Sequence, residues 1–161
     1  MIEHRGRLDG SRRRFGIVVS SFNQRVTREL LSGATACLLE HGVEDDKIEV
    51  FRVPGAWEIP ALLQRAAESG RFDALIALGA VIRGATPHFD YVAGGAAQGA
   101  AAVAAASGVP VAFGVLTTDT LEQALERAGA STGKEGNKGR EAALSALEMA
   151  DLLSKIGGEK P

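Results

Sequence analysis

The sequence predicts an α/β fold, a three-layer sandwich in which a four-stranded parallel sheet lies between two layers of helices. Two observations carry this prediction. Short runs of apolar and β-branched residues alternate along the chain with longer stretches whose apolar residues recur at helical spacing. The strand-like runs are apolar at most positions, as expected for parallel strands that are covered on both faces.

Four segments have the composition of buried strands. Residues 15–20 and 48–53 are short β-branched runs, and the second of them ends at the helix-breaking pair Pro54-Gly55. Residues 74–82 are apolar throughout, and residues 109–117 form the last run. Each is 6–9 residues long, a usual length for a strand.

Helical periodicity occupies the stretches between and after these strands. Gly42, Gly70 and Gly108 each follow such a stretch, where glycine favours the end of a helix. Pro60 stands in the first turn of its helix, where a missing N–H group is tolerated. The predicted helices span residues 27–41, 59–69, 88–107, 121–128 and 138–156.

This alternation predicts one domain. With right-handed crossovers it gives a flavodoxin-like sandwich over residues 15–156, with a flexible N-terminal segment at 1–14 and a tail at 157–161. In such sheets, ligands bind at the carboxyl ends of the strands. We therefore expect the functional residues directly after the four strands.

Composition excludes several classes of partner. The formal net charge of −2 gives no reason to expect nucleic acid or an anionic membrane. Arginines cluster near the start of the chain, and a solvated terminus is favoured there over a nucleic-acid arm. Cys37 is the single cysteine, which excludes an internal disulfide and indicates a buried apolar position. No signal peptide or membrane-length apolar run is present, so we expect a cytoplasmic protein.

Several familiar site motifs are absent. The phosphate-loop pattern G-x-x-x-x-G-K-[ST] does not occur, and the glycine fingerprint of dinucleotide domains is missing after the first strand. The first strand also lacks the acidic residues that a response regulator carries at its end. No histidines have metal-ligand spacing. These absences argue against a nucleotide or dinucleotide domain and against a histidine metal site.

The end of the third strand carries the richest chemistry. A loop containing Arg83, Gly84 and Thr86 leads through Pro87 into the next helix, whose free N–H groups favour an anion. The alternative is a simple helix cap, with Thr86 at the N-cap and Pro87 at the first helical position, and the two interpretations are compatible. His88 begins that helix, so it is a candidate for proton transfer, although a lone histidine is more often a capping or packed residue.

Two other strand ends supply candidate contacts. In the segment after the second strand, Gly55 and Ala56 expose backbone groups, and Glu58 can accept hydrogen bonds or favour a helix N-terminus. Phe22, after the first strand, can stack on a flat ring or pack in the core. Arg127 and Lys138 flank the glycine-rich link near the fourth strand, as phosphate-binding cations or as solvated charges.

Six strings occur in order and at the expected intervals, which makes the pattern specific. The strings are residues 22–23, 53–60, 79–91, 113–118, 123–129 and 137–143. Together they closely resemble the 6,7-dimethyl-8-ribityllumazine synthase family, over residues 14–153. The resemblance implies condensation of 5-amino-6-(D-ribitylamino)uracil with 3,4-dihydroxy-2-butanone 4-phosphate, without metal or cofactor.

The same resemblance implies a role for each matching residue. His88 corresponds to the family's proton donor. The pyrimidine and ribityl chain are expected to contact Phe22, Ala56, Trp57, Glu58, Ala80, Val81, Ile82 and Phe113. The phosphate is expected to contact Ala85, Thr86, Arg127 and Lys138. A non-catalytic flavin- or lumazine-binding protein and a shell-forming protein are the alternatives, and the presence of both His88 and Arg127 argues against them.

The family also implies an oligomer. Its members form pentamers or icosahedral 60-mers, with active sites between subunits, and an association with riboflavin synthase is a further expectation. The helix over residues 88–107 is rich in small side chains that allow close helix approach. The link over residues 129–137 is longer than in the shell-forming members, which favours free pentamers.

Overall fold

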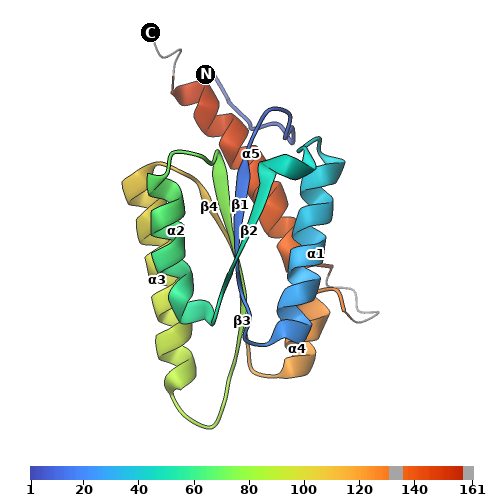
Figure 1. The fold of residues 1–161 in the computed structure, drawn as a ribbon, viewed down its shortest axis with the longest axis vertical. Helices are drawn as coiled ribbons and strands as arrows, with labels where there is room; N and C mark the ends of the chain where they lie inside the picture. The colour runs from blue at the N-terminus through green and yellow to red at the C-terminus, as the bar shows by residue number, and fades with distance from the viewer. Residues whose placement is uncertain (131–135, 158–161) are drawn as a thin grey trace.

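The computed structural model describes residues 1–130 and 136–157, and it confirms the predicted three-layer α/β sandwich (Figure 1). All strand pairs in the sheet are parallel, in the order β2-β1-β3-β4. The strands are β1 (Phe15–Ser20), β2 (Ile48–Val53), β3 (Ala74–Ile82) and β4 (Val111–Thr118). The helices are α1 (Gln24–Glu40), α2 (Ile59–Glu68), α3 (His88–Ser107), α4 (Leu121–Arg127) and α5 (Lys138–Ile156), with short 3-10 turns η1 (Asp45–Lys47) and η2 (Ala56–Glu58).

The element boundaries follow local chemistry closely. Gly42, Gly70 and Gly108 end helices as predicted, each with a positive φ angle that glycine adopts without steric cost. The prediction was wrong at the start of β4: the strand begins at Val111 because the Val109 N–H donates to the Ser107 hydroxyl (3.1 Å) and Pro110 has no N–H. The two 3-10 turns were not predicted.

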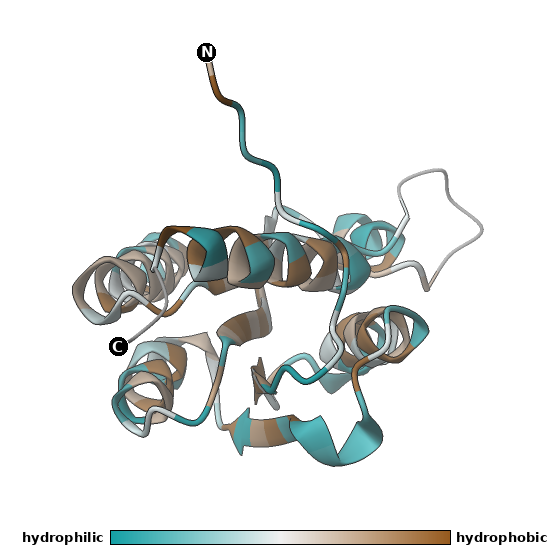
Figure 2. Cartoon of the chain, turned by 90° about the horizontal axis from the view of Figure 1, so that it is seen from above, coloured by the Kyte–Doolittle hydropathy of each residue, from teal (hydrophilic) through white to brown (hydrophobic). Residues whose placement is uncertain are grey.

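Two apolar clusters cover the two faces of the sheet. Helices α2 and α3 pack on one face, and α1, α4 and α5 pack on the other (Figure 1). Figure 2 shows the hydrophobic strands between these two layers of helices. Cys37 lies fully buried in the α1 side of the core, as predicted, and burial raises the pKa of its thiol.

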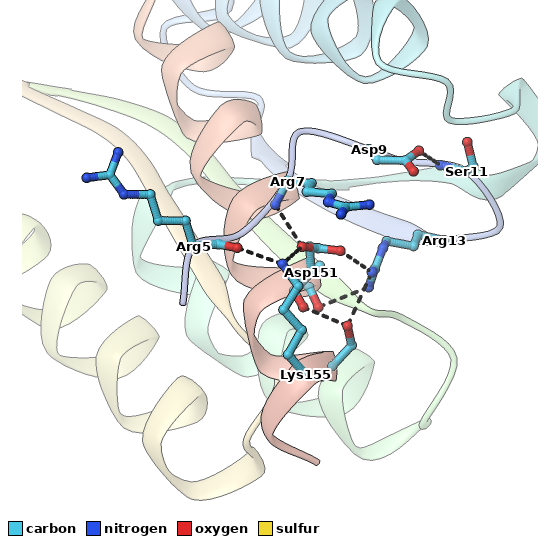
Figure 3. Close-up of polar contacts among 9 residues, drawn as sticks. Arg5, Arg7, Asp9, Ser11, Arg13, Asp151 and Lys155 are labelled. Atoms are coloured by element: carbon cyan, nitrogen blue, oxygen red, sulfur yellow. Dashed lines mark hydrogen bonds and ion pairs between the residues drawn. The ribbon is translucent and has the colours of Figure 1, made fainter. Parts of the chain in front are cut away.

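The N-terminal segment, expected to be flexible, lies against α5 in this structure (Figure 3). The backbone N–H of Arg7 and the Arg13 guanidinium donate to the Asp151 carboxylate at 2.7 and 3.0 Å. Lys155 pairs with the same carboxylate at 2.7 Å. The division into segment, domain and tail stays a prediction, and residues 158–161 of the tail lie outside the described part of the chain. Within that part, no helix is long and apolar enough to cross a membrane.

Candidate functional site

A cleft of about 720 Å³ lies at the carboxyl ends of β1, β2 and β3 and against the first turns of α3. Its position agrees with the rule for open parallel sheets, in which ligands bind beyond these strand ends. The structure brings together there most of the residues singled out from the sequence. They are Phe22, Ala56, Trp57, Glu58, Ala80, Val81, Ile82, Thr86 and His88.

The cleft is also lined by residues that sequence reasoning did not select. Tyr91 and Val92 follow His88 by three and four positions on α3, so they share its helix face. That spacing is a signal by which both residues could have been found. Asn23 is another such residue, and its place in the cleft depends on the pairing of β1 with β3, which no local sequence pattern indicates.

Asn23 shapes the floor of the cleft through its backbone and its side chain. It adopts a left-handed conformation (φ 60°), which asparagine tolerates better than most residues, and it is the N-cap of α1. Its side-chain amide donates to the Ala80 carbonyl at 2.8 Å. One carbonyl of the β3 end is therefore already paired, and the orientation of this strand end is fixed.

The turn η2 presents an aromatic ring and a carboxylate. Glu58 accepts a hydrogen bond from the Gly55 N–H at 3.0 Å, so its carboxylate caps the turn and is held at the cleft. Trp57 is 61% exposed, and its indole lies over Gly95 of α3, where an added Cβ would overlap Cζ3. Phe22, which follows the neighbouring strand β1, is 71% exposed. Two accessible rings are thus available to a planar ligand.

The loop before α3 differs from its sequence-based interpretation in two respects. The alternative interpretation of the loop, with Thr86 as the N-cap and Pro87 at the first helical position, is wrong in detail: α3 begins at His88 and Pro87 is its N-cap. Proline is well tolerated at this position because its ring fixes φ near the value of a helical residue. Arg83 is engaged within the chain: its Nε donates to Asp119 at 2.8 Å, and this carboxylate raises the pKa of the guanidinium. Ala85 lies in this exposed loop between two lining residues but does not itself line the cleft.

A second pocket, of about 340 Å³, contains the remaining predicted residues. Phe113 of β4, Arg127 of α4 and Lys138 of α5 line it together. Lys138 is paired with Glu141 at 2.9 Å on the same helix. The residues that line this pocket are all different from those that line the cleft. In a single chain, the structure therefore separates the cationic candidates from His88.

A family model described as 6,7-dimethyl-8-ribityllumazine synthase matches residues 12–154. The chain belongs to this family. The match covers the whole sheet and all five α-helices except the last two residues of α5, so both pockets lie within it.

Members of the lumazine synthase family are transferases of riboflavin biosynthesis. A de novo designed Rossmann fold protein is also similar to this chain, with 19% sequence identity, a TM-score of 0.39, and coverage of 69% of this chain and 90% of the designed chain. That similarity supports no functional argument. Among residues 1–130 and 136–157, no cluster of three or more histidine, cysteine or acidic side chains could hold a metal ion.

Proposed function

We propose that this member of the lumazine synthase family condenses 5-amino-6-(D-ribitylamino)uracil with 3,4-dihydroxy-2-butanone 4-phosphate to 6,7-dimethyl-8-ribityllumazine, releasing phosphate and water. One observation supports it most directly. His88 lies at the start of α3 in the same cleft as the exposed ring of Phe22 and the carboxylate of Glu58. A planar, hydroxyl-bearing substrate and a proton-transfer group fit this arrangement.

The cleft would hold the uracil. Phe22 stacks on the pyrimidine ring, while Glu58 accepts hydrogen bonds from ribityl hydroxyls. Ala56 and Trp57 line the ribityl side, and the end of β3, from Ala80 through Val81 to Ile82, contributes backbone contacts. Because Asn23 already holds the Ala80 carbonyl, this wall is preorganised before the substrate arrives.

Each chemical step moves a proton. An amine of the uracil attacks the ketone, the resulting carbinolamine loses water to give an imine, and phosphate is eliminated. The second amine of the uracil then closes the ring on the remaining carbonyl, with loss of a second water. His88 accepts and returns protons during these steps. The loop at Ala85 and Thr86 contacts the phosphate, and Arg127 and Lys138 stabilise the charge as it departs. An amine and a ketone condense readily without a catalyst. Holding the two reactants together therefore supplies much of the acceleration.

The separation of the two pockets supports an oligomer. Phe113, Arg127 and Lys138 face their own pocket, so in our proposal the second pocket of one subunit completes the cleft of its neighbour. We favour a pentamer over a 60-subunit shell. The longer link that favours it lies mostly in residues 131–135, outside the described residues, so this choice stays a prediction. An association with riboflavin synthase and a cytoplasmic location also stay predictions.

The reaction is tested by mixing the purified protein with both substrates and following lumazine absorbance against a protein-free control. His88→Ala should slow turnover by about 10²-fold, the lower end for acid–base catalysis. Arg127→Ala should weaken the reaction mainly by weakening the binding of the phosphorylated substrate. Arg65→Ala, at an exposed side chain of α2, is the matched control. No acceleration by the wild-type protein, combined with a Trp57 fluorescence change on adding riboflavin, would favour a binding protein instead.

Mixed oligomers test the shared site. Subunits carrying His88→Ala and subunits carrying Arg127→Ala are unfolded, mixed in equal amounts and refolded together. If each site takes its cleft and its second pocket from different subunits, about a quarter of the sites regain both intact halves. Activity that stays at the level of the separate variants would place the whole site in one chain. Sedimentation of the wild-type protein distinguishes a pentamer from a shell.

A further inference from the structure

Asn137 connects three helices through one side chain. It is the N-cap of α5, and its Oδ1 accepts from the Arg140 N–H at 3.0 Å. Its Nδ2 donates to the Glu29 carbonyl of α1 at 2.9 Å and to the Ala128 carbonyl after α4 at 2.7 Å. Both amide hydrogens and the amide oxygen are used, so only one orientation of the side chain satisfies all the contacts.

The residues next to these contacts are the two cations of the second pocket. Arg127 directly precedes Ala128, and Lys138 directly follows Asn137. Ala128 and Asn137 form an isolated antiparallel bridge, to which the side-chain hydrogen bond is added. The hydrogen bond therefore links the backbones that carry Arg127 and Lys138, although the two residues come from different helices.

Close packing holds this junction in place. A Cβ added at Gly33 of α1 would overlap the Asn137 amide, and one added at Gly139 would overlap the Leu30 carbonyl. Gly129 turns the chain after α4 with a φ of 74°. The start of α5 thus lies directly on α1, and its position is set by contacts that leave little room for adjustment.

We propose that Asn137 is a positioning residue that sets the spacing of Arg127 and Lys138, so that both cations contact one phosphate group. Long cationic side chains reach a ligand together only when their backbones are held at a fixed separation, and preorganisation lowers the cost of ordering them on binding. The inference rests on the proposed function for the identity of the substrate, but the phosphate chemistry is testable without it.

The decisive variant is Asn137→Ser. Serine retains an oxygen for the N-cap and adds no charge, but it removes both amide donors. The probe is inorganic phosphate, titrated into the assembled protein and followed by calorimetry. We expect phosphate affinity to fall about five- to tenfold, the loss of one aligned charge contact. The KM for the butanone phosphate should rise by a similar factor, and the KM for the uracil should stay unchanged.

Thr120→Ala is the matched control. It removes the N-cap at the other end of α4, where Thr120 accepts from the Gln123 N–H, and it leaves the junction at Asn137 intact. It should lower the melting temperature without changing phosphate affinity. If Asn137→Ser does not fold, Gly33→Ala displaces the same amide from the opposite side and should weaken phosphate binding in the same way.

The outcomes separate the two proposals. If Asn137→Ser loses stability but binds phosphate as tightly as the wild type, Asn137 is only structural and the inference is overturned. A wild-type protein that forms lumazine without binding inorganic phosphate would also overturn it, while leaving the proposed reaction in place. If the wild-type protein forms no lumazine but phosphate binding weakens in Asn137→Ser, the positioning role is supported and the proposed reaction is contradicted.

Discussion

The guanidinium of Arg83 and the carboxylate of Asp119 join the ends of β3 and β4, with Nε and Oδ1 2.8 Å apart. The Arg83 N–H also donates to the Thr118 carbonyl at 2.9 Å. The same guanidinium lies 4.5 Å from the centre of the Phe89 ring, in the first turn of α3. Arg83 therefore ties together both ends of the loop that carries Thr86 and leads to His88.

Arg83→Ala should loosen this loop and lower kcat/KM about tenfold, because small displacements near a reacting group are costly. Thermal stability should change little, since exposed ion pairs contribute about 0–1 kcal/mol. Steady-state kinetics and thermal denaturation check both expectations. Asp119→Asn removes the partner charge while retaining Arg83, so it should produce a similar loss. Loss of phosphate binding in Arg83→Ala alone would show that Arg83 contacts the ligand directly.

Asp151 should make the N-terminal segment sensitive to acid. The pKa of its carboxyl is lowered by the hydrogen bond from Lys155, then by the Arg7 N–H and by the charges of Lys155 and Arg13. A carboxyl group whose pKa is lower in the folded state than in the unfolded state stabilises the fold at pH values above its unfolded-state pKa, here 3.8. That stabilisation is lost as the pH falls through the folded-state pKa. Asp151→Asn should therefore destabilise the protein by about 1–2 kcal/mol at pH 7.

The difference between wild type and Asp151→Asn should shrink as the pH falls below 3.8. Thermal denaturation of both proteins at pH 7 and at pH 3 measures it. Glu148→Gln, one turn earlier on α5, is the control. A wild-type advantage that is as large at pH 3 as at pH 7 would contradict the electrostatic explanation.

Gly95→Ala should displace the indole of Trp57, because the added Cβ would overlap the ring. The neighbouring Gly94 has no atom within 4 Å of an added Cβ in the described structure, so Gly94→Ala is the matched control. Gly94→Ala should raise the free energy of unfolding by about 0.5–1 kcal/mol through helix propensity, and Gly95→Ala should not.

The fluorescence of Trp57 measures this displacement directly, because it is the only tryptophan in the chain. We expect a shifted emission spectrum and weaker uracil binding in Gly95→Ala alone. Sedimentation of both variants shows whether assembly is preserved. Identical spectra for Gly95→Ala and wild type would mean that the indole is not held against α3.

Thr27→Val should stabilise the protein. Thr27 is fully buried in α1, and within the described residues its hydroxyl has no hydrogen-bond partner. Valine has nearly the same shape, so the change removes the cost of an unsatisfied polar group, about 1–3 kcal/mol, without opening a cavity. Chemical denaturation checks the sign. A destabilised variant would indicate that the hydroxyl is satisfied by an ordered water.

Much of the fold could be predicted because it depends on local pattern. The apolar run of β3 requires a strand covered on both faces, and the glycines after α1, α2 and α3 end their helices through positive φ angles. The position of the cleft follows from the same pattern, since parallel strands bring their carboxyl ends to one edge. These features need only the periodicity of a segment and the steric properties of single residues.

The contacts within and between the sites required the tertiary structure. The small residues of α3 were expected to allow close helix approach, and only the tertiary structure shows that two of them, Gly95 and Gly99, receive Trp57 and Pro60 of the same chain. Arg83 donates to Asp119, which lies 36 positions further along the chain. The Arg7 N–H donates to Asp151, which lies 144 positions further along.

The sequence by itself determined which elements form, where helices end and at which edge of the sheet the chemistry gathers, because these depend on side-chain type and local spacing. The tertiary structure decided which candidates share a pocket. Arg127 and Lys138 meet in a pocket of their own because Asn137 joins α4 to α5, while His88 faces the cleft beside Trp57. Such pairings depend on distances between elements remote in sequence, and no local pattern encodes them.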